Sequence, residues 1–89
     1  MLKEEMKEKD IPVMTEVKSS NIEKIGHDSE GKNLYIFFKG SGLYRYGNVT
    51  LEEFELLKKS ESVGKAFHST IRIFGAKYPC VSITIIKES

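Results

Sequence analysis

The middle of the chain consists of short runs rich in apolar residues, separated by residues that are typical of turns. Residues 33–39 carry β-branched and aromatic side chains that are apolar on both faces, which is typical of the central strand of a sheet. Residues 21–28 precede this run across a turn at 29–32, and residues 43–47 follow it across a Gly-Ser-Gly segment at 40–42. The pattern therefore predicts a three-stranded antiparallel meander.

The spacing of the apolar residues then changes from two to about 3.6, the period of a helix. Thr50 is followed three positions later by Glu53, the capping-box arrangement that begins a helix. The apolar face of this first helix consists of Leu51, Phe54 and Leu57. A second helix is expected over residues 63–74, where apolar side chains recur every three or four positions. These side chains are Val63, Phe67, Ile71 and Phe74.

The two ends of the chain flank these elements. Leu2 and Met6 lie four positions apart among alternating acids and bases, which predicts a short helix if the two side chains can dock, and a fraying arm otherwise. Residues 13–18 alternate apolar and polar side chains, as in a short strand or an extended arm. Residues 80–86 predict a final strand, one face of which is wholly β-branched. This strand needs a sheet edge to pair with, in its own chain or in a partner.

With 89 residues, the chain has room for one small domain. We expect an α+β fold in which a small antiparallel sheet, the three-stranded meander plus flanking strands, packs against two helices. The expected divisions are an N-terminal arm or short helix (residues 1–16), a central domain (17–75) and an extra C-terminal strand (76–89).

Composition excludes several classes of protein. The 14 Lys and Arg against 13 Asp and Glu give a formal net charge of +1, so no bulk charge attracts the whole molecule to nucleic acid or membrane. One cysteine, Cys80, forms neither an internal disulfide nor a zinc cage by itself. The N-terminus resembles neither a signal peptide nor a transit peptide, and no apolar run is long enough to span a bilayer. We therefore expect a cytoplasmic protein with no membrane partner.

Charge is uneven along the chain, because residues 62–87 contain no Asp or Glu. Lys65, His68 and Arg72 are spaced to share one helical face beside the apolar stripe. Ser62 and Gly64 stand at the helix start, where free amides can hold an anion. Tyr44 and Tyr46 offer rings for stacking, and Arg45 a guanidinium for phosphate. The candidate ligand-binding residues are thus Tyr44, Arg45, Tyr46, Ser62, Gly64, Lys65, His68 and Arg72.

Each of these residues also has a purely structural interpretation. Ser62 can cap the helix, Gly64 can allow close packing, and Lys65 and Arg72 can be a solvated face. Alternating tyrosines on a strand commonly pack into a core. Both interpretations stay open from the sequence.

Several spaced motifs make the chain resemble a known family. They are Val17–Ile22, Ile25–Asp28, Leu43–Tyr46 with Val49, Ser62–Phe67, and Ile71 with Arg72. Over about residues 17–74 the chain is similar to the KTSC domain, named for its occurrence at the C-terminus of some lysyl-tRNA synthetases. The resemblance implies an antiparallel sheet followed by a helical pair, in stand-alone bacterial and phage proteins, with suspected nucleic-acid binding and no established catalysis. It also implies that the expected cytoplasm is that of a bacterium or a phage-infected host cell. His27 and His68 depart from the family, which commonly has an aromatic residue and an Asn there.

Catalysis finds little support in the sequence. The side chains of His68 and Ser69 diverge on a helix, and Cys80 lacks the neighbours of a catalytic cysteine. No phosphate-binding glycine loop and no metal-ligand spacing occurs. We therefore expect no enzyme, no cofactor and no metal.

The hypothesis is a small non-catalytic binding protein for a phosphate-bearing ligand: RNA, single-stranded DNA, or a small or cyclic nucleotide. One version of it is a phage protein that sequesters a nucleotide defence signal of its host. The alternative is a protein interaction module, in which the strand over residues 80–86 and the acidic first helix form the surface of a homo-oligomer or bind another protein.

Overall fold

The computed structural model describes residues 2–87, and it contains the predicted meander. The three strands are β3 (Ile22–Asp28), β4 (Asn33–Phe38) and β5 (Gly42–Tyr46), and both pairings are antiparallel. Ile36 of the central strand faces Ile25 on one side and Tyr44 on the other. The reversal between β4 and β5 needs glycine, because Gly40 and Gly42 have φ of 78° and 99°.

The first helix, α1 (Leu51–Lys59), begins as its capping box predicts. The backbone N–H of Glu53 donates to Thr50 Oγ1 at 3.1 Å, and the Thr50 N–H donates to Glu53 Oε1 at 3.0 Å. Two of the amides that a helix start leaves without partners are thereby satisfied.

The second helix lies where the spacing of the apolar residues predicts it, but it ends earlier than predicted and changes from α-helical to π-helical turns. It consists of α2 (Val63–Phe67) followed directly by η2 (His68–Arg72), a π-helical segment with wider turns. The Ala66 carbonyl accepts the hydroxyls of Thr70, at 2.6 Å, and Ser69, at 3.3 Å. These side chains compete for the acceptor that the regular helix would use, which favours the wider turn. The helix predicted to continue to residue 74 therefore ends at Arg72.

The N-terminal segment is a strand, so the expected short helix is wrong. β1 (Leu2–Lys7) pairs in parallel with β6 (Cys80–Ile86), and a short 3₁₀ turn, η1 (Glu8–Asp10), leads to β2 (Met14–Glu16). An isolated helix of this length is marginal in water, whereas a strand beside β6 pairs its backbone along six positions. The 13–18 arm is extended as expected, and β2 pairs with β3.

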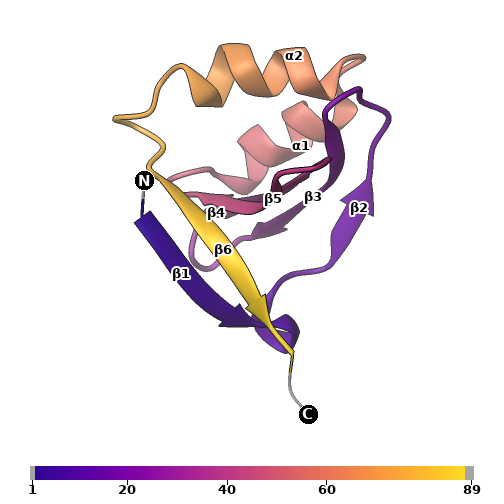
Figure 1. The fold of residues 1–89 in the computed structure, drawn as a ribbon. Coiled ribbons are helices and arrows are strands. Elements are labelled where there is room, and N and C mark those ends of the chain that lie inside the picture. Colours follow the sequence, from indigo (N-terminus) through magenta and orange to yellow (C-terminus); the bar gives the residue numbers. More distant parts are fainter. Residues whose placement is uncertain (1, 88–89) are drawn as a thin grey trace.

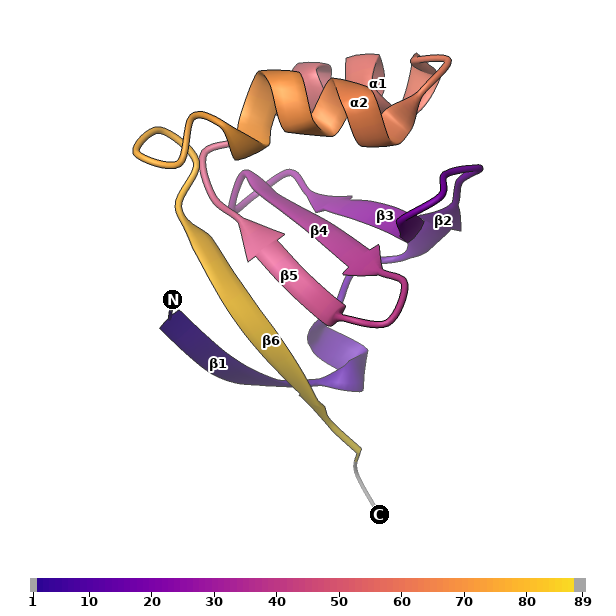
Figure 2. The same cartoon turned by 45° about the horizontal axis from the view of Figure 1, so that its top comes forward.

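All six strands form one sheet in the order β1-β6-β5-β4-β3-β2, with both helices on one side of it (Figures 1 and 2). β6 lies between β1 and β5, so its two edges are both paired within the chain. The fold is thus α+β as expected, although the parallel β1–β6 pair makes the sheet mixed.

Side chains pack on both faces of this sheet. The larger core joins the sheet to the helices; its most deeply buried members are Ile22, Ile25, Leu34, Ile36, Val49, Phe67 and Ile71. A smaller cluster of Tyr35, Leu43 and Ile83 occupies the other face, where residues of the N-terminal segment partly cover it. Across residues 2–87, no helix is both long and apolar enough to cross a membrane.

Candidate functional site

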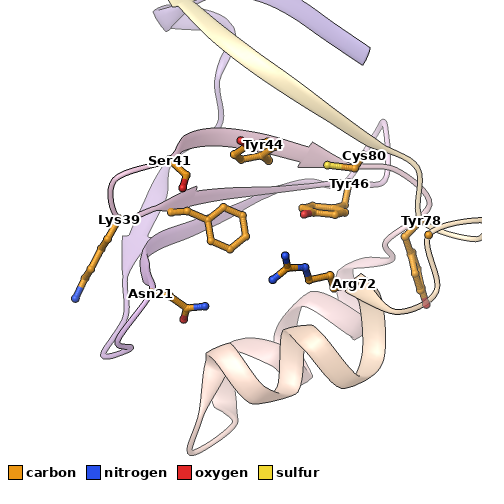
Figure 3. Close-up of a pocket in the computed structure, with 10 residues that line it drawn as sticks. Asn21, Lys39, Ser41, Tyr44, Tyr46, Arg72, Tyr78 and Cys80 are labelled. Carbon is orange, nitrogen blue, oxygen red and sulfur yellow. The ribbon is translucent and has the colours of Figure 1, made fainter. Parts of the chain in front are cut away.

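A hollow of about 460 Å³ opens between the helical segment η2 and the meander strands. Phe38 and Tyr44 form much of its apolar lining, with their rings edge-on at 5.5 Å. Tyr46 lies deeper, 7% exposed, against the ring of Phe67 at 5.0 Å. Figure 3 shows Arg72 reaching from the helix into the space in front of these rings. The first hollow therefore combines aromatic surface with one guanidinium.

A second hollow, of about 380 Å³, lies where the start of α2 meets the loop before β3. Its lining consists of Ser19, Ser20, Asn21, Ser62, Gly64, Lys65, Phe67, His68 and Arg72. Asn21 and Arg72 line both hollows. The two hollows are thus neighbours, and Arg72 stands between them.

The charged side chains that line the two hollows are all basic. Lys65, His68 and Arg72 are exposed and line the second hollow together, as their helical spacing predicts. Neither lining contains an Asp or a Glu, and within residues 2–87 no carboxylate forms an ion pair with Lys65 or Arg72. Lys39, at the rim of the first hollow, donates from its ammonium to the Ser19 carbonyl at 2.8 Å. The local field therefore favours an anion.

The environment of Tyr46 is apolar on one side and basic on the other. Burial and the neighbouring Cys80 thiol raise the pKa of the Tyr46 hydroxyl well above its ordinary value, and the nearby Arg72 charge opposes the rise. The phenol is therefore neutral at physiological pH, and it presents a ring and a hydroxyl without adding negative charge.

Ser62 and Gly64 line the second hollow and also have structural roles. Ser62 Oγ accepts the Lys65 backbone N–H at 3.4 Å and caps the helix. A Cβ on Gly64 would lie 2.9 Å from Asn21 Oδ1 and 3.1 Å from Ser19 Oγ, so glycine permits the close approach of helix and loop. Because α2 itself has only five residues, the positive potential of this hollow comes from its basic side chains and not from a helix terminus.

Arg45 does not belong to this site. It points to the opposite face of the sheet, where its guanidinium donates to both carboxylate oxygens of Glu4, at 2.5 and 3.0 Å. Hydrogen bonds and charge from this pair lower the pKa of Glu4 and raise that of Arg45. The guanidinium predicted to contact phosphate instead ties β5 to β1 across β6.

Sequence reasoning missed part of the lining. Phe38, Asn21, Lys39, Ser41, Tyr78 and Cys80 line the first hollow without having been singled out as ligand contacts. Asn21 could have been found from the sequence, because it lies two positions after Ser19 in the polar segment between the arm and the strand. Tyr78 is oriented by a short hydrogen bond that its hydroxyl donates to Glu53 of the capping box, a contact between residues distant in the sequence.

The two histidines have different surroundings. His27 Nε2 lies 2.6 Å from the Val49 carbonyl oxygen, and its ring stacks on Phe54 at 5.2 Å. It lines neither hollow, whereas His68 is exposed in the second. No group of three or more His, Cys, Asp or Glu side chains in residues 2–87 could hold a metal ion.

Comparison with known proteins agrees with the resemblance noted from the motifs. The family model of the KTSC domain matches residues 18–74. The crystal structure of a KTSC domain protein from Yersinia pestis is similar with a TM-score of 0.74 and 29% identity, and the match covers 81% of this chain and 97% of that one. No curated protein matches. Since the family model spans more than half of the chain, this protein belongs to the KTSC domain family.

Proposed function

We propose that the protein binds a phosphate-bearing ligand, a nucleotide or a short single strand of nucleic acid, without transforming it. One observation carries the proposal: an aromatic hollow adjoins a basic hollow, the linings of both lack carboxylates, and Arg72 lines both. Aromatic rings stack on bases, and Lys and Arg neutralise phosphate. The site therefore has groups that can contact both the base and the phosphate of a nucleotide.

The scale of the basic surface supports a small ligand. Lys65 and Arg72 are the permanently charged side chains of the second hollow, and the ring of His68 adds a hydrogen-bonding group. Duplex binding typically involves six or more phosphate contacts, and the formal net charge of +1 supplies no additional long-range attraction. Retention of a small nucleotide, including sequestration of a signalling nucleotide, is the form of binding that this charge favours.

The disposition of Ser69 supports binding without catalysis. Its hydroxyl donates to the Ala66 carbonyl at 3.3 Å, and it follows His68 directly on the helical segment. A serine nucleophile needs a base within hydrogen-bonding reach, and adjacent helical residues point in different directions.

The proposal is tested by removing the two cations of the second hollow. Lys65→Ala with Arg72→Ala should weaken binding of a fluorescent nucleotide or short oligonucleotide by about 100-fold, at about tenfold for each lost charge-assisted contact. The matched control is Lys3→Ala with Lys59→Ala, which removes the same charge from exposed positions outside both hollows. Equal loss in both double variants, or none in the first, would refute the proposal.

The second candidate is a protein interaction surface, which exposed apolar side chains favour. Leu56 on α1 is 68% exposed, and Ile85 and Ile86 of β6 are 38% and 40% exposed. Because both edges of β6 are paired, such a surface uses side chains and not strand addition. If it joins copies of this chain, Leu56→Glu or Ile86→Glu should reduce the mass measured by light scattering. A wild-type protein that is monomeric at high concentration would contradict self-association.

A further inference from the structure

We infer that the ligand is a single nucleotide, with its base in the first hollow and its phosphate in the second. This inference rests on the proposed function and narrows it. It follows from how the linings of the two hollows differ, from the residues that they share, and from the carboxylates next to them.

The first hollow has the size and lining of a base site. Its 460 Å³ lies within the usual range for small-molecule sites, and Phe38 and Tyr44 are half-buried, so their rings are anchored yet reachable. Asn21 and Ser41 add polar groups at its rim, as Figure 3 shows for their side chains. An aromatic surface with a few polar groups accommodates a base better than it accommodates a phosphate.

The second hollow has the charge of a phosphate site. Two permanent cations match the charge of about −1.5 to −2 that a phosphate monoester carries near neutral pH. Since Arg72 lines both hollows, its guanidinium stands where the base-bearing part of the ligand meets its phosphate. The ligand that satisfies both hollows at once is therefore a nucleotide.

Two residues that line the combined site have a carboxylate next to them. Glu61, which is exposed, immediately precedes Ser62 of the second hollow. Tyr78 lines the first hollow and donates its hydroxyl to the Glu53 carboxylate. The backbone of a longer strand would bring further phosphates toward these negative groups, which opposes its binding. The charge pattern thus selects one nucleotide over an extended strand.

The experiment is calorimetric titration of the full chain with the four ribonucleoside monophosphates, the four ribonucleosides, inorganic phosphate and a ten-residue oligoadenylate. At least one monophosphate should bind at least tenfold more tightly than both its nucleoside and phosphate. The oligoadenylate should bind no more tightly than AMP after correction for the number of sites.

Two variants then assign the hollows. Tyr44→Ala should reduce the preference of the protein for the monophosphate over inorganic phosphate, and Tyr44→Phe should retain it, because the ring is kept. Lys65→Ala should reduce the preference for the monophosphate over the nucleoside. If neither preference changes in these variants, the assignment is overturned.

Failure of the single-nucleotide inference can be distinguished from failure of the proposed function. An oligoadenylate that binds at least tenfold more tightly than AMP, with steep salt dependence, overturns the single-nucleotide inference and leaves the proposed function intact. Phosphate that binds as tightly as every monophosphate also overturns it. If no phosphate-bearing probe binds, the inference and the proposed function both fail.

Discussion

Arg45 and Arg72 show how differently one side chain can be used on the two faces of a single sheet. Arg45 is paired in bidentate geometry with Glu4 on the face away from the helices. Arg72 extends into the space between helix and strands, where no carboxylate lines either hollow (Figure 3). The charge of Arg45 is neutralised by Glu4 within the molecule, whereas no carboxylate in the linings neutralises the charge of Arg72. The positions of the carboxylates thus distinguish the candidate site from the structural ion pair.

The largest expected effect comes from the core beneath the site. Phe67, 1% exposed, contacts the rings of Phe38 and Tyr46. Phe67→Ala should lower the free energy of unfolding by about 3–5 kcal/mol, because it leaves a cavity under both hollows. Urea denaturation measures this loss. The control is Phe74→Ala, at a side chain 51% exposed, which should stay within about 0.5 kcal/mol of wild type. Equal losses would show that the helix does not pack through Phe67.

The next effect separates the two arginines directly. Arg72→Ala should weaken nucleotide binding by about tenfold or more and leave the melting temperature nearly unchanged, because the side chain is exposed and unpaired with any carboxylate of residues 2–87. Arg45→Ala should do the opposite: it lowers the melting temperature slightly by removing the Glu4 pair and leaves affinity intact. Affinity that falls equally in both variants would place the ligand elsewhere.

Adding a carboxylate to the site should have a similar but smaller effect. Ser20 is exposed and lines the second hollow. Ser20→Asp should weaken nucleotide binding severalfold by repelling phosphate, with a larger effect at low salt because exposed charges are screened. Ser20→Asn adds a side chain of nearly the same size without charge and should bind like wild type. Equal losses in the two variants would indicate steric obstruction and not charge.

Interactions between residues close together in the sequence could be predicted from it, and interactions between distant residues could not. The Thr50–Glu53 box and the Lys65, His68, Arg72 face depend on spacing within one helix, and both are present. The parallel pairing of β1 with β6 joins the two ends of the chain, so no local pattern predicts it.

The pairing of Arg45 with Glu4 could not be predicted for the same reason, because Glu4 lies on β1, where the local sequence predicts a short helix or a fraying arm. The π-helical turn depends on competition between the Ser69 and Thr70 hydroxyls for the Ala66 carbonyl. The spacing of the apolar residues gives no information about this competition. Local sequence patterns therefore predict where the helices lie. Contacts between residues distant in the sequence determine which basic side chains remain without a carboxylate partner.

The smallest expected effect is the pH dependence contributed by Glu53. Although partial burial opposes it, hydrogen bonds from Tyr78 and Thr50 hold the pKa of Glu53 below its ordinary value of 4.5. A carboxylate with a lowered pKa stabilises the fold above its unfolded pKa, and the contribution is lost as pH falls through the folded value. The loss therefore begins near pH 5 and grows below pH 4.5. Melting temperatures from pH 7 to 3 should fall less steeply for Glu53→Gln. An unchanged slope would show that this contact does not contribute.

The most direct test of the central claim, that the basic hollow free of carboxylates holds the phosphate of a ligand, is a two-dimensional amide NMR titration of the wild-type chain with a nucleoside monophosphate. Amide signals of residues 19–21 and 62–72 should shift in a saturable way, together with those of 38–46, while those of β1 stay in place. Shifts confined to β1, or no saturable shift at millimolar nucleotide, would contradict the account.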